Sequence, residues 1–329
     1  MQAVFSKLSP EAVIAAVESY GFELDGRLYA LNSYENRVYQ LGHAGGWWVV
    51  KFYRPDRWSD AAILEEHQFT KELSAADLPV AVPVERDGTT LFVQPNEGDG
   101  SKASYRFAVF PFVAAQSVDI ESPGTLEFLG RSLGRLHAVG ARYRFAARPS
   151  LSVDRLGWQA RAAVLESEVL SKVVGDPALE IKYAEASTAL LERVEVSWAT
   201  FGPMAPIRIH GDCHLGNLLA RADGPVFVDF DDCMMGPRVQ DLWMLLSGSS
   251  EMRERQWSQI IGGYQQFHHL DEAERALIEP LRALRMVHHA AWVAARWEDP
   301  AFPKAFPWFT SARYWQDYIS DLWEQGEAC

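Results

Sequence analysis

Two short apolar runs that each end in polar side chains place the tightest limit on how this chain can fold. The first, Ile207–His210, leads into the letters GDCHLGN, and the second, Val226–Phe230, leads into the letters DD. Apolar runs of this length, bounded by turn residues, are typical of buried strands. If a tight loop joins the two strands, Asp212, Asn217 and Asp229 meet at one rim of the structure.

Oxygen-bearing side chains in this order point to phosphoryl transfer. Mg²⁺ binds oxygen ligands, and Asn217 and Asp229 would supply the protein's share while phosphate and water supply the rest. Asp212 precedes the asparagine by five residues and would receive the proton of an attacking hydroxyl. Protein kinases use this order in their catalytic loop and in the metal-binding aspartate that follows it. The alternative is that all three are turn residues, but their combined order and spacing favour a site.

The rest of the chain divides into a β-rich first third and a helical remainder, with the boundary near residues 113–117. This division predicts an α+β fold of two lobes, like that of protein kinases. Residues 1–113 would form an antiparallel β-sheet lobe with a helix, and residues 114–329 a larger, mainly helical lobe. The predicted elements are a helix after Ser9, a hairpin over 36–53, a helix over 59–75, strands flanking 83–93, a loop over 94–104, a strand over 107–113, and helices over 123–140, 154–174, 177–198 and most of the chain after Val239.

The β-rich third contains a lysine that needs a partner. Lys51 interrupts the apolar run Trp48–Phe52, where an unpaired charge would be costly. Glu66 shares a face of the next helix with its packing residues and is the predicted partner, with Glu65 as the second choice. A lysine held by a glutamate can bridge the α and β phosphates of ATP. The alternative is an edge-strand lysine whose ammonium reaches solvent.

Two further segments of this lobe would complete an ATP site. The loop Leu31–Val38 has no GxGxxG pattern, but its backbone N–H groups and a hydroxyl can cover phosphates. The strand that ends near residue 113 can offer main-chain groups to adenine within an apolar slot. Because Pro111 has no N–H, the donor would be Phe112 or Val113. The alternative is that the first segment is an ordinary turn and the second an ordinary core strand.

Charge and cysteine content exclude several classes of protein. Asp and Glu total 44 against 31 Lys and Arg, so the net charge is −13. Nucleic acids and anionic membranes both need a positive field, so neither is an expected partner. Three cysteines cannot form a disulfide framework, the N-terminus lacks a signal-peptide pattern, and no segment approaches the ~20 apolar residues of a membrane span. We therefore expect a cytoplasmic protein, acting as a monomer.

Several polar residues near the motifs have two interpretations. Asp241 opens an apolar helix and could either cap that helix or support the catalytic loop. His210 is expected to orient the loop. The remaining cysteines and histidines near the motifs are interpreted as ordinary residues, because no zinc spacing is present and buried thiols are usually inert. These residues are Cys213, Cys233, His214, His288 and His289.

With these motifs in view, the sequence resembles the stress response kinase A family of bacterial Ser/Thr protein kinases. That family lies within the aminoglycoside phosphotransferase and choline kinase superfamily. The resemblance runs from Leu31 to Trp308 and is carried by LNSYENRVYQ, VVKFYRPDRW, ILEEHQF, FAVFPFV, LGRLH, HGDCHLGN, FVDFDD, GPRVQDLWMLL and DPAFPKAFPW. HGDxxxxN specifies only the superfamily, whereas NSYENRVYQ, KFYRP and DPAFPKAFPW are narrower.

The resemblance implies roles for individual residues. It makes Asp212 the proton acceptor, and Asn217 and Asp229 the Mg²⁺ ligands, with Asp229 also placing the phosphates. It places Ser33 at the serine that contacts ATP and Lys51 at the ATP lysine. It further implies a cytoplasmic, ATP-dependent kinase that phosphorylates protein Ser or Thr and responds to envelope and oxidative stress. The 94–104 loop looks longer than the family pattern.

Two other functions remain open on sequence alone, because one scaffold can host several activities. One is a small-molecule kinase for an aminoglycoside, choline, homoserine or sugar hydroxyl, which the net charge mildly favours if the substrate is cationic. The other is a nucleotide-binding regulator without catalysis. For either kinase, we expect the segment Glu279–Trp308 to wall the acceptor cleft. Its Arg282, Arg285 and Arg296 would pair with the acidic 229–232 tip, or brace the lobe through Glu279, Glu298 or Asp299.

Overall fold

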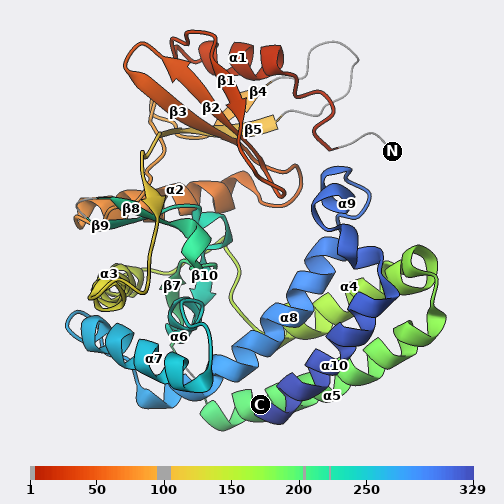
Figure 1. Ribbon diagram of the computed structural model, residues 1–329. Coiled ribbons are helices and arrows are strands. Elements are labelled where there is room, and N and C mark those ends of the chain that lie inside the picture. The colour runs from red at the N-terminus through yellow and green to blue at the C-terminus, as the bar shows by residue number, and fades with distance from the viewer. Residues whose placement is uncertain (1–3, 95–104, 203–204, 222–223) are drawn as a thin grey trace.

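The computed structural model describes residues 4–94, 105–202, 205–221 and 224–329, and these form the two expected lobes (Figure 1). The smaller lobe contains α1 (Pro10–Glu18), β1 (Leu28–Ala30), β2 (Arg37–His43), β3 (Gly46–Phe52), α2 (Asp60–Ala75), β4 (Phe92–Gln94) and β5 (Tyr105–Pro111). The larger lobe contains β6 (Gln116–Ser117), α3 (Thr125–Gly140), α4 (Ala160–Glu166), α5 (Pro177–Phe201), β7 (Ile207–Ile209), β8 (Leu218–Arg221), β9 (Gly224–Phe227), β10 (Met234–Gly236), α6 (Val239–Trp243), α7 (Ser250–Tyr264), α8 (Ile278–Ala294), α9 (Ala301–Ala305) and α10 (Ala312–Ala328).

The sheet of the smaller lobe is antiparallel, in the order β1-β2-β3-β5-β4. The predicted hairpin is β2 and β3, joined by a tight turn at His43 and Gly46. Helix α1 begins at the Ser9 cap, whose hydroxyl accepts a hydrogen bond from the Ala12 N–H. This helix lies against one face of the sheet (Figure 1). Its Val13 and Val17 share a buried cluster with residues of β2, β3 and β5.

Helix α2 joins the two lobes. It begins at the Ser59 cap, as predicted, and its side chains divide between two cores. Ile63 packs in a small cluster with Tyr53 under the sheet, whereas Phe69 and Leu73 belong to the large core of the helical lobe. The middle of α2, which carries Glu66, therefore lies at the junction of the lobes.

Three sequence predictions were wrong in detail. The predicted strands at 207–210 and 226–230 are not neighbours, because β7 pairs with β10 and β9 pairs with β8. The partners β8 and β10 span only four and three residues, too few to show a period. The predicted helix 154–174 is three pieces, with Glu168 in the left-handed region at φ 52°.

The third error concerns the strands predicted on both sides of 83–93. A strand, β4, follows that stretch, but on the other side Val80 makes only an isolated bridge to Phe227. Pro83 has no N–H to donate to a sheet, and the Val84 N–H donates a single hydrogen bond to Val109 O. Of the predicted 94–104 loop, residues 95–104 lie outside the described part of the chain. Among the described residues, none of the helices combines the length and apolarity needed to cross a membrane.

Helices α3 and α7 pack backbone against backbone through glycines. A Cβ on Gly130 would stand 2.0 Å from Ile260 O, and one on Gly263 would stand 2.0 Å from Glu127 O. The side chains at these positions must be absent for the helices to approach this closely. Gly262, which neighbours Gly263 on α7, has nothing within 4 Å of its would-be Cβ.

We predict that Gly130→Ala lowers the free energy of unfolding by about 1–3 kcal/mol, because the added methyl group forces the two helices apart. Gly262→Ala is the matched control and should be neutral, or stabilise by up to about 1 kcal/mol through its higher helix propensity. Urea denaturation of both variants measures the difference. Equal effects of the two substitutions would contradict the packing described for α3 and α7.

Candidate active site

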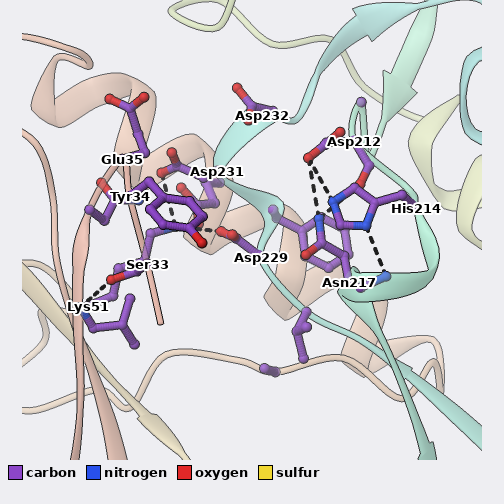
Figure 2. A pocket seen from close by; sticks show the side chains of 18 of the residues that line it. Ser33, Tyr34, Glu35, Lys51, Asp212, His214, Asn217, Asp229, Asp231 and Asp232 are labelled. Atoms are coloured by element: carbon purple, nitrogen blue, oxygen red, sulfur yellow. Dashed lines mark hydrogen bonds and ion pairs between the residues drawn. The ribbon is translucent and has the colours of Figure 1, made fainter. Parts of the chain in front are cut away.

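A pocket of about 960 Å³ lies between the lobes and collects the residues that the sequence singled out. The smaller lobe contributes the loop before β2, the strand β3 and the connector after β5. The larger lobe contributes the loops after β7 and β9 and the face of α8. Figure 2 shows the polar part of this pocket. Its lining includes Ser33, Lys51, Glu66, Phe112, Val113, Asp212, Asn217 and Asp229.

The loop after β7 is held by a buried carboxylate. Asp241 accepts hydrogen bonds from the N–H groups of His210 (2.7 Å) and Gly211 (2.8 Å), and it lies 3.1 Å from His137 Nε2. Asp241 therefore supports the loop, which decides between its two sequence interpretations. Gly211 has φ +84°, and a Cβ there would stand 2.2 Å from Asp232 O. Only glycine suits that position.

His210 and Asn217 tie this loop to the segment after β9. His210 Nε2 lies 3.0 Å from Val228 O, so this histidine orients the backbone, as expected. Asn217 O accepts a hydrogen bond from Val228 N–H at 3.0 Å. Asp229 then takes a left-handed conformation with φ 58°. Although β7 and β9 do not pair, these bonds bring Asp212, Asn217 and Asp229 to one rim of the pocket.

Asn217 and Asp229 present oxygens suited to a divalent cation. The Asn217 side-chain N–H donates to Asp212 O at 2.9 Å, and no described residue makes a hydrogen bond to Asn217 Oδ1. Figure 2 shows that oxygen on the side facing Asp229. The Asp229 side chain is 53% exposed. The described residues include no cluster of three or more His, Cys, Asp or Glu that could hold a metal. The two oxygens of Asn217 and Asp229 suit a cation that takes its remaining ligands from phosphate and water.

Lys51 is buried, and three carboxylates surround it. Its Nζ lies 3.4 Å from Glu66 Oε1, 3.0 Å from Asp229 Oδ1 and 3.0 Å from Asp231 Oδ1. The expected pair with Glu66 is present. Burial alone would lower the pKa of the Lys51 ammonium, but the charges of Asp229, Asp231 and Glu66 raise that pKa well above its ordinary value. Lys51 is therefore cationic at neutral pH.

Glu65, the second choice, has a different role. Its carboxylate accepts hydrogen bonds from three successive backbone N–H groups, at Ala146, Ala147 and Arg148. It thus fixes a loop of the helical lobe against α2. Arg148 in turn places its guanidinium 2.8 Å from Glu66 Oε2, so Glu66 pairs with a cation on each side.

The sequence did not predict that Asp231 pairs with Lys51 or that Arg57 pairs with Asp231 and Asp232. The Asp231 side chain is 4% exposed and contacts both Lys51 and Arg57, whereas Asp232 lies 2.5 Å from Arg57. The sequence left two kinds of partner open for the arginines of the last third, this acidic tip or acidic residues that brace the lobe, and the first of these is wrong. Arg57 and Arg148 lie in loops, where no periodic pattern marks them.

The loop before β2 is anchored to the helical lobe. Glu35 accepts a hydrogen bond from Trp292 Nε1 at 2.5 Å and another from Arg296 Nη2 at 3.1 Å. Tyr34 packs on Phe306, with ring centroids 5.3 Å apart. Ser33 stays within the loop, where its Oγ accepts from Val38 N–H at 3.2 Å. The loop therefore covers the pocket as a structured lid whose position depends on α8 and α9.

The connector after β5 distinguishes the two candidate adenine donors. Phe112 N–H donates to Trp47 O at 3.2 Å, so it is already used within the sheet. Val113 follows it along the pocket wall. The geometry therefore favours Val113 over Phe112 as the donor.

Asp212 has partners on both carboxylate oxygens. Arg285 Nη1 lies 2.7 Å from Oδ1, and His214 Nε2 lies 3.4 Å from Oδ2. His214 accepts a hydrogen bond from Gly216 N–H on Nδ1, so its neutral form carries the proton on Nε2 and donates to Asp212. Burial would raise the pKa of Asp212, but His214 and Arg285 outweigh it and hold that pKa below its ordinary value. The sequence analysis interpreted His214 as ordinary.

The three arginines of the last third have three different partners. Arg282 lies 3.1 Å from Glu279 and braces the lobe, Arg285 contacts Asp212, and Arg296 contacts Glu35. The pocket lining includes Arg285 but not Arg282 or Arg296. Both Cys213 and Cys233 are fully buried, and burial raises the pKa of each thiol, which suits the structural role predicted for them.

Comparison with known proteins agrees with this geometry. The sequence pattern of the phosphotransferase enzyme family matches residues 28–284. A protein named stress response kinase A, from Salmonella choleraesuis, is 42% identical over 98% of this chain and 93% of its own length. A protein named Serine/threonine protein kinase RdoA, from Salmonella typhimurium, matches at the same identity and coverage.

A solved structure shows the same fold at lower sequence identity. It is an amicoumacin kinase in complex with AMP-PNP, Ca²⁺ and Ami, with a TM-score of 0.72. Its sequence is 20% identical, and the match covers 96% of this chain and 93% of that one. The likeness extends across both lobes.

We predict that Lys51 and Glu66 act as one unit. Lys51→Ala should weaken nucleotide binding and lower kcat, and the double variant with Glu66→Ala should be little worse than either single variant. Steady-state kinetics of the four proteins measure the coupling. Glu65→Ala is the control, because its bonds to residues 146–148 predict lost stability with ATP handling retained. Strictly additive losses for Lys51 and Glu66 would contradict the prediction.

Proposed function

The chain belongs to the phosphotransferase enzyme family and, within it, to the stress response kinase A family, and from this premise we propose that it is an ATP- and Mg²⁺-dependent Ser/Thr protein kinase. The enzyme would transfer the γ-phosphate of ATP to a serine or threonine hydroxyl of a protein. The observation that carries the proposal is the convergence of Lys51, Asp212, Asn217 and Asp229 on one pocket between the lobes.

Asp212 has the geometry of the group that receives the acceptor's proton. Its carboxylate lies at the rim of the pocket and is ionised at neutral pH, since its pKa is held below the ordinary value. Asn217 and His214 hold the carboxylate in place from the Oδ2 side. A hydroxyl that approaches a lone pair of Asp212 is oriented for attack, and orientation is a large part of catalysis in phosphoryl transfer.

Lys51 supplies the positive charge for the phosphates. Its ammonium is fixed by Glu66 and Asp231 and reaches Asp229 at the pocket surface. Asn217 Oδ1 and the Asp229 carboxylate would hold Mg²⁺, which when bound neutralises phosphate charge and orients the phosphates. Ser33 and the rest of the anchored loop would cover the phosphates, and Val113 would offer its N–H to adenine.

The choice of a protein acceptor over a small molecule rests on the relatives. The similar protein from Salmonella typhimurium is named a serine/threonine protein kinase. The amicoumacin kinase shares the fold at 20% identity, which carries no conclusion about the acceptor. Incubation with labelled ATP distinguishes the functions when two classes of acceptor are compared with buffer alone: serine-containing peptides, and small-molecule hydroxyls such as aminoglycosides and choline. Labelled peptide supports the proposal, label only in small molecules overturns it, and nucleotide binding without turnover indicates a regulator.

We predict that Asp212→Asn keeps ATP binding and lowers kcat by about 10²–10⁴-fold, the usual cost of losing a general base. The substitution preserves the size of the side chain and removes its charge. Nucleotide affinity by calorimetry and kcat by label transfer are the two measurements. Wild-type turnover in this variant would remove Asp212 from the proposed role.

We predict different metal responses for the two proposed ligands. Asp229→Ala removes a charged ligand that also contacts Lys51, so its activity should not return fully at high Mg²⁺. Asn217→Ala removes a neutral ligand and should be milder and partly rescued. A Mg²⁺ titration of kcat for each variant tests this. Activity that is independent of Mg²⁺ in both variants would exclude them as ligands.

A further inference from the structure

The guanidinium of Arg285 lies beside Asp212 at the acceptor side of the pocket. Arg285 is on α8, and its Nη1 is 2.7 Å from Asp212 Oδ1. Its side chain is 42% exposed, unlike the buried or nearly buried cations around Lys51. The contact adds to the hydrogen bonds by which Asp241, His210 and Asn217 already fix β7 and its loop. Arg285 also lines the pocket, so its exposed guanidinium can meet what enters there.

Most of the hydrogen-bonding capacity of Arg285 is unused. Its Nη1 contacts Asp212 and the sulfur of Met244, whereas Nη2 and Nε have no hydrogen-bond partner in the described part of the chain. Those two nitrogens form one edge of the planar guanidinium. That edge binds a carboxylate or a phosphate through two parallel hydrogen bonds. Arg285 could thus hold Asp212 with one nitrogen and an incoming anion with the other two.

The case for an anion rests on the open edge of Arg285, because cations already hold the nearby carboxylates. The pocket's carboxylates other than Asp212 are paired: Glu35 with Arg296, Glu66 with Arg148 and Lys51, Asp229 and Asp231 with Lys51, and Asp232 with Arg57. The α8 wall also carries His288 and His289. Burial lowers the pKa of His288 to about 4 and lowers that of His289 as well, so both are neutral at pH 7.

The remainder of this wall is aromatic. His289, Trp292 and Phe306 line the pocket and contact one another. Trp292 is fixed by its bond to Glu35. An acceptor on this side therefore meets flat aromatic rings, the exposed guanidinium of Arg285 and the Asp212 carboxylate that it contacts. The net charge of −13 mildly favours a cationic substrate. The α8 wall of the pocket, however, presents Arg285, two neutral histidines and aromatic rings.

We propose that Arg285 selects the phosphate acceptor by binding an acidic side chain next to the acceptor hydroxyl. The preferred acceptor is then a serine or threonine with Asp or Glu within about two residues, since an extended peptide advances ~3.3 Å per residue. This inference rests on the proposed protein kinase activity. Arg285 acts as a specificity residue: it binds the acceptor's carboxylate and places the hydroxyl beside Asp212, which takes its proton.

Three peptides that differ at one position test this selection. They share a single serine and carry Glu, Gln or Lys beside it. For the wild-type enzyme we expect kcat/KM to be about tenfold higher for the Glu peptide than for the Gln peptide, mainly through KM, and lowest for the Lys peptide. In Arg285→Gln the ratio between Glu and Gln peptides should fall to about one. Arg285→Lys should restore part of the preference, and Arg285→Glu should favour the Lys peptide.

Ratios between peptides separate selection from any general effect of Arg285 on Asp212, because a change in the base affects all three peptides alike. Arg282→Gln is the matched control, since Arg282 lies one turn away on α8 and pairs with Glu279. It should keep the wild-type ratio. Equal rates for all peptides in the wild type, or a preference that survives Arg285→Gln, would overturn this inference and leave the kinase assignment standing. Failure to label any peptide while ATP is consumed would overturn both.

Discussion

The structure depends on the buried charge of Lys51. An ammonium removed from water costs several kcal/mol unless opposite charges surround it. Here Glu66 on α2 and the aspartates after β9 provide those charges, so one side chain joins the sheet, the linking helix and the segment that carries Asp229. Arg57, Arg148 and Asp232 extend the cluster. Its carboxylates are Glu66, Asp229, Asp231 and Asp232, and its cations are Lys51, Arg57 and Arg148, so carboxylates exceed cations by one. Asp229 is the most exposed carboxylate of the cluster.

A second set of contacts holds the lobes together on the other side of the pocket. Asp299 lies 3.0 Å from Arg54 and 3.3 Å from Arg37, and Glu35 is bonded to Trp292 and Arg296. In Figure 1, α9 rises from the helical lobe toward the sheet at this place. The loop before β2 and the α8 wall of the pocket are thus parts of one assembly. Occupancy of either side should therefore influence the other.

The sequence was sufficient for the features that have a local signal. Alternation and capping predicted the β2–β3 hairpin, α1 and α2, and an isolated lysine in an apolar strand predicted its pairing with Glu66. The pairing of β7 with β10 could not be predicted, because a three-residue strand has no period. Arg57, Arg148 and the link from Arg285 to Asp212 were also missed. Their partners lie between 73 and 175 residues away, and only tertiary packing determines those distances.

The central claim is that nucleotide, metal and acceptor meet at one rim formed by Lys51, Asp212, Asn217 and Asp229. A crystal structure of the intact chain with a non-hydrolysable ATP analogue and Mg²⁺ tests it most directly. The account predicts phosphates against Lys51 and a metal bound by Asn217 Oδ1 and the Asp229 carboxylate, with the terminal phosphate facing Asp212. A metal bound by Asp231 and Asp232 instead, or a nucleotide outside the pocket between the lobes, would contradict it.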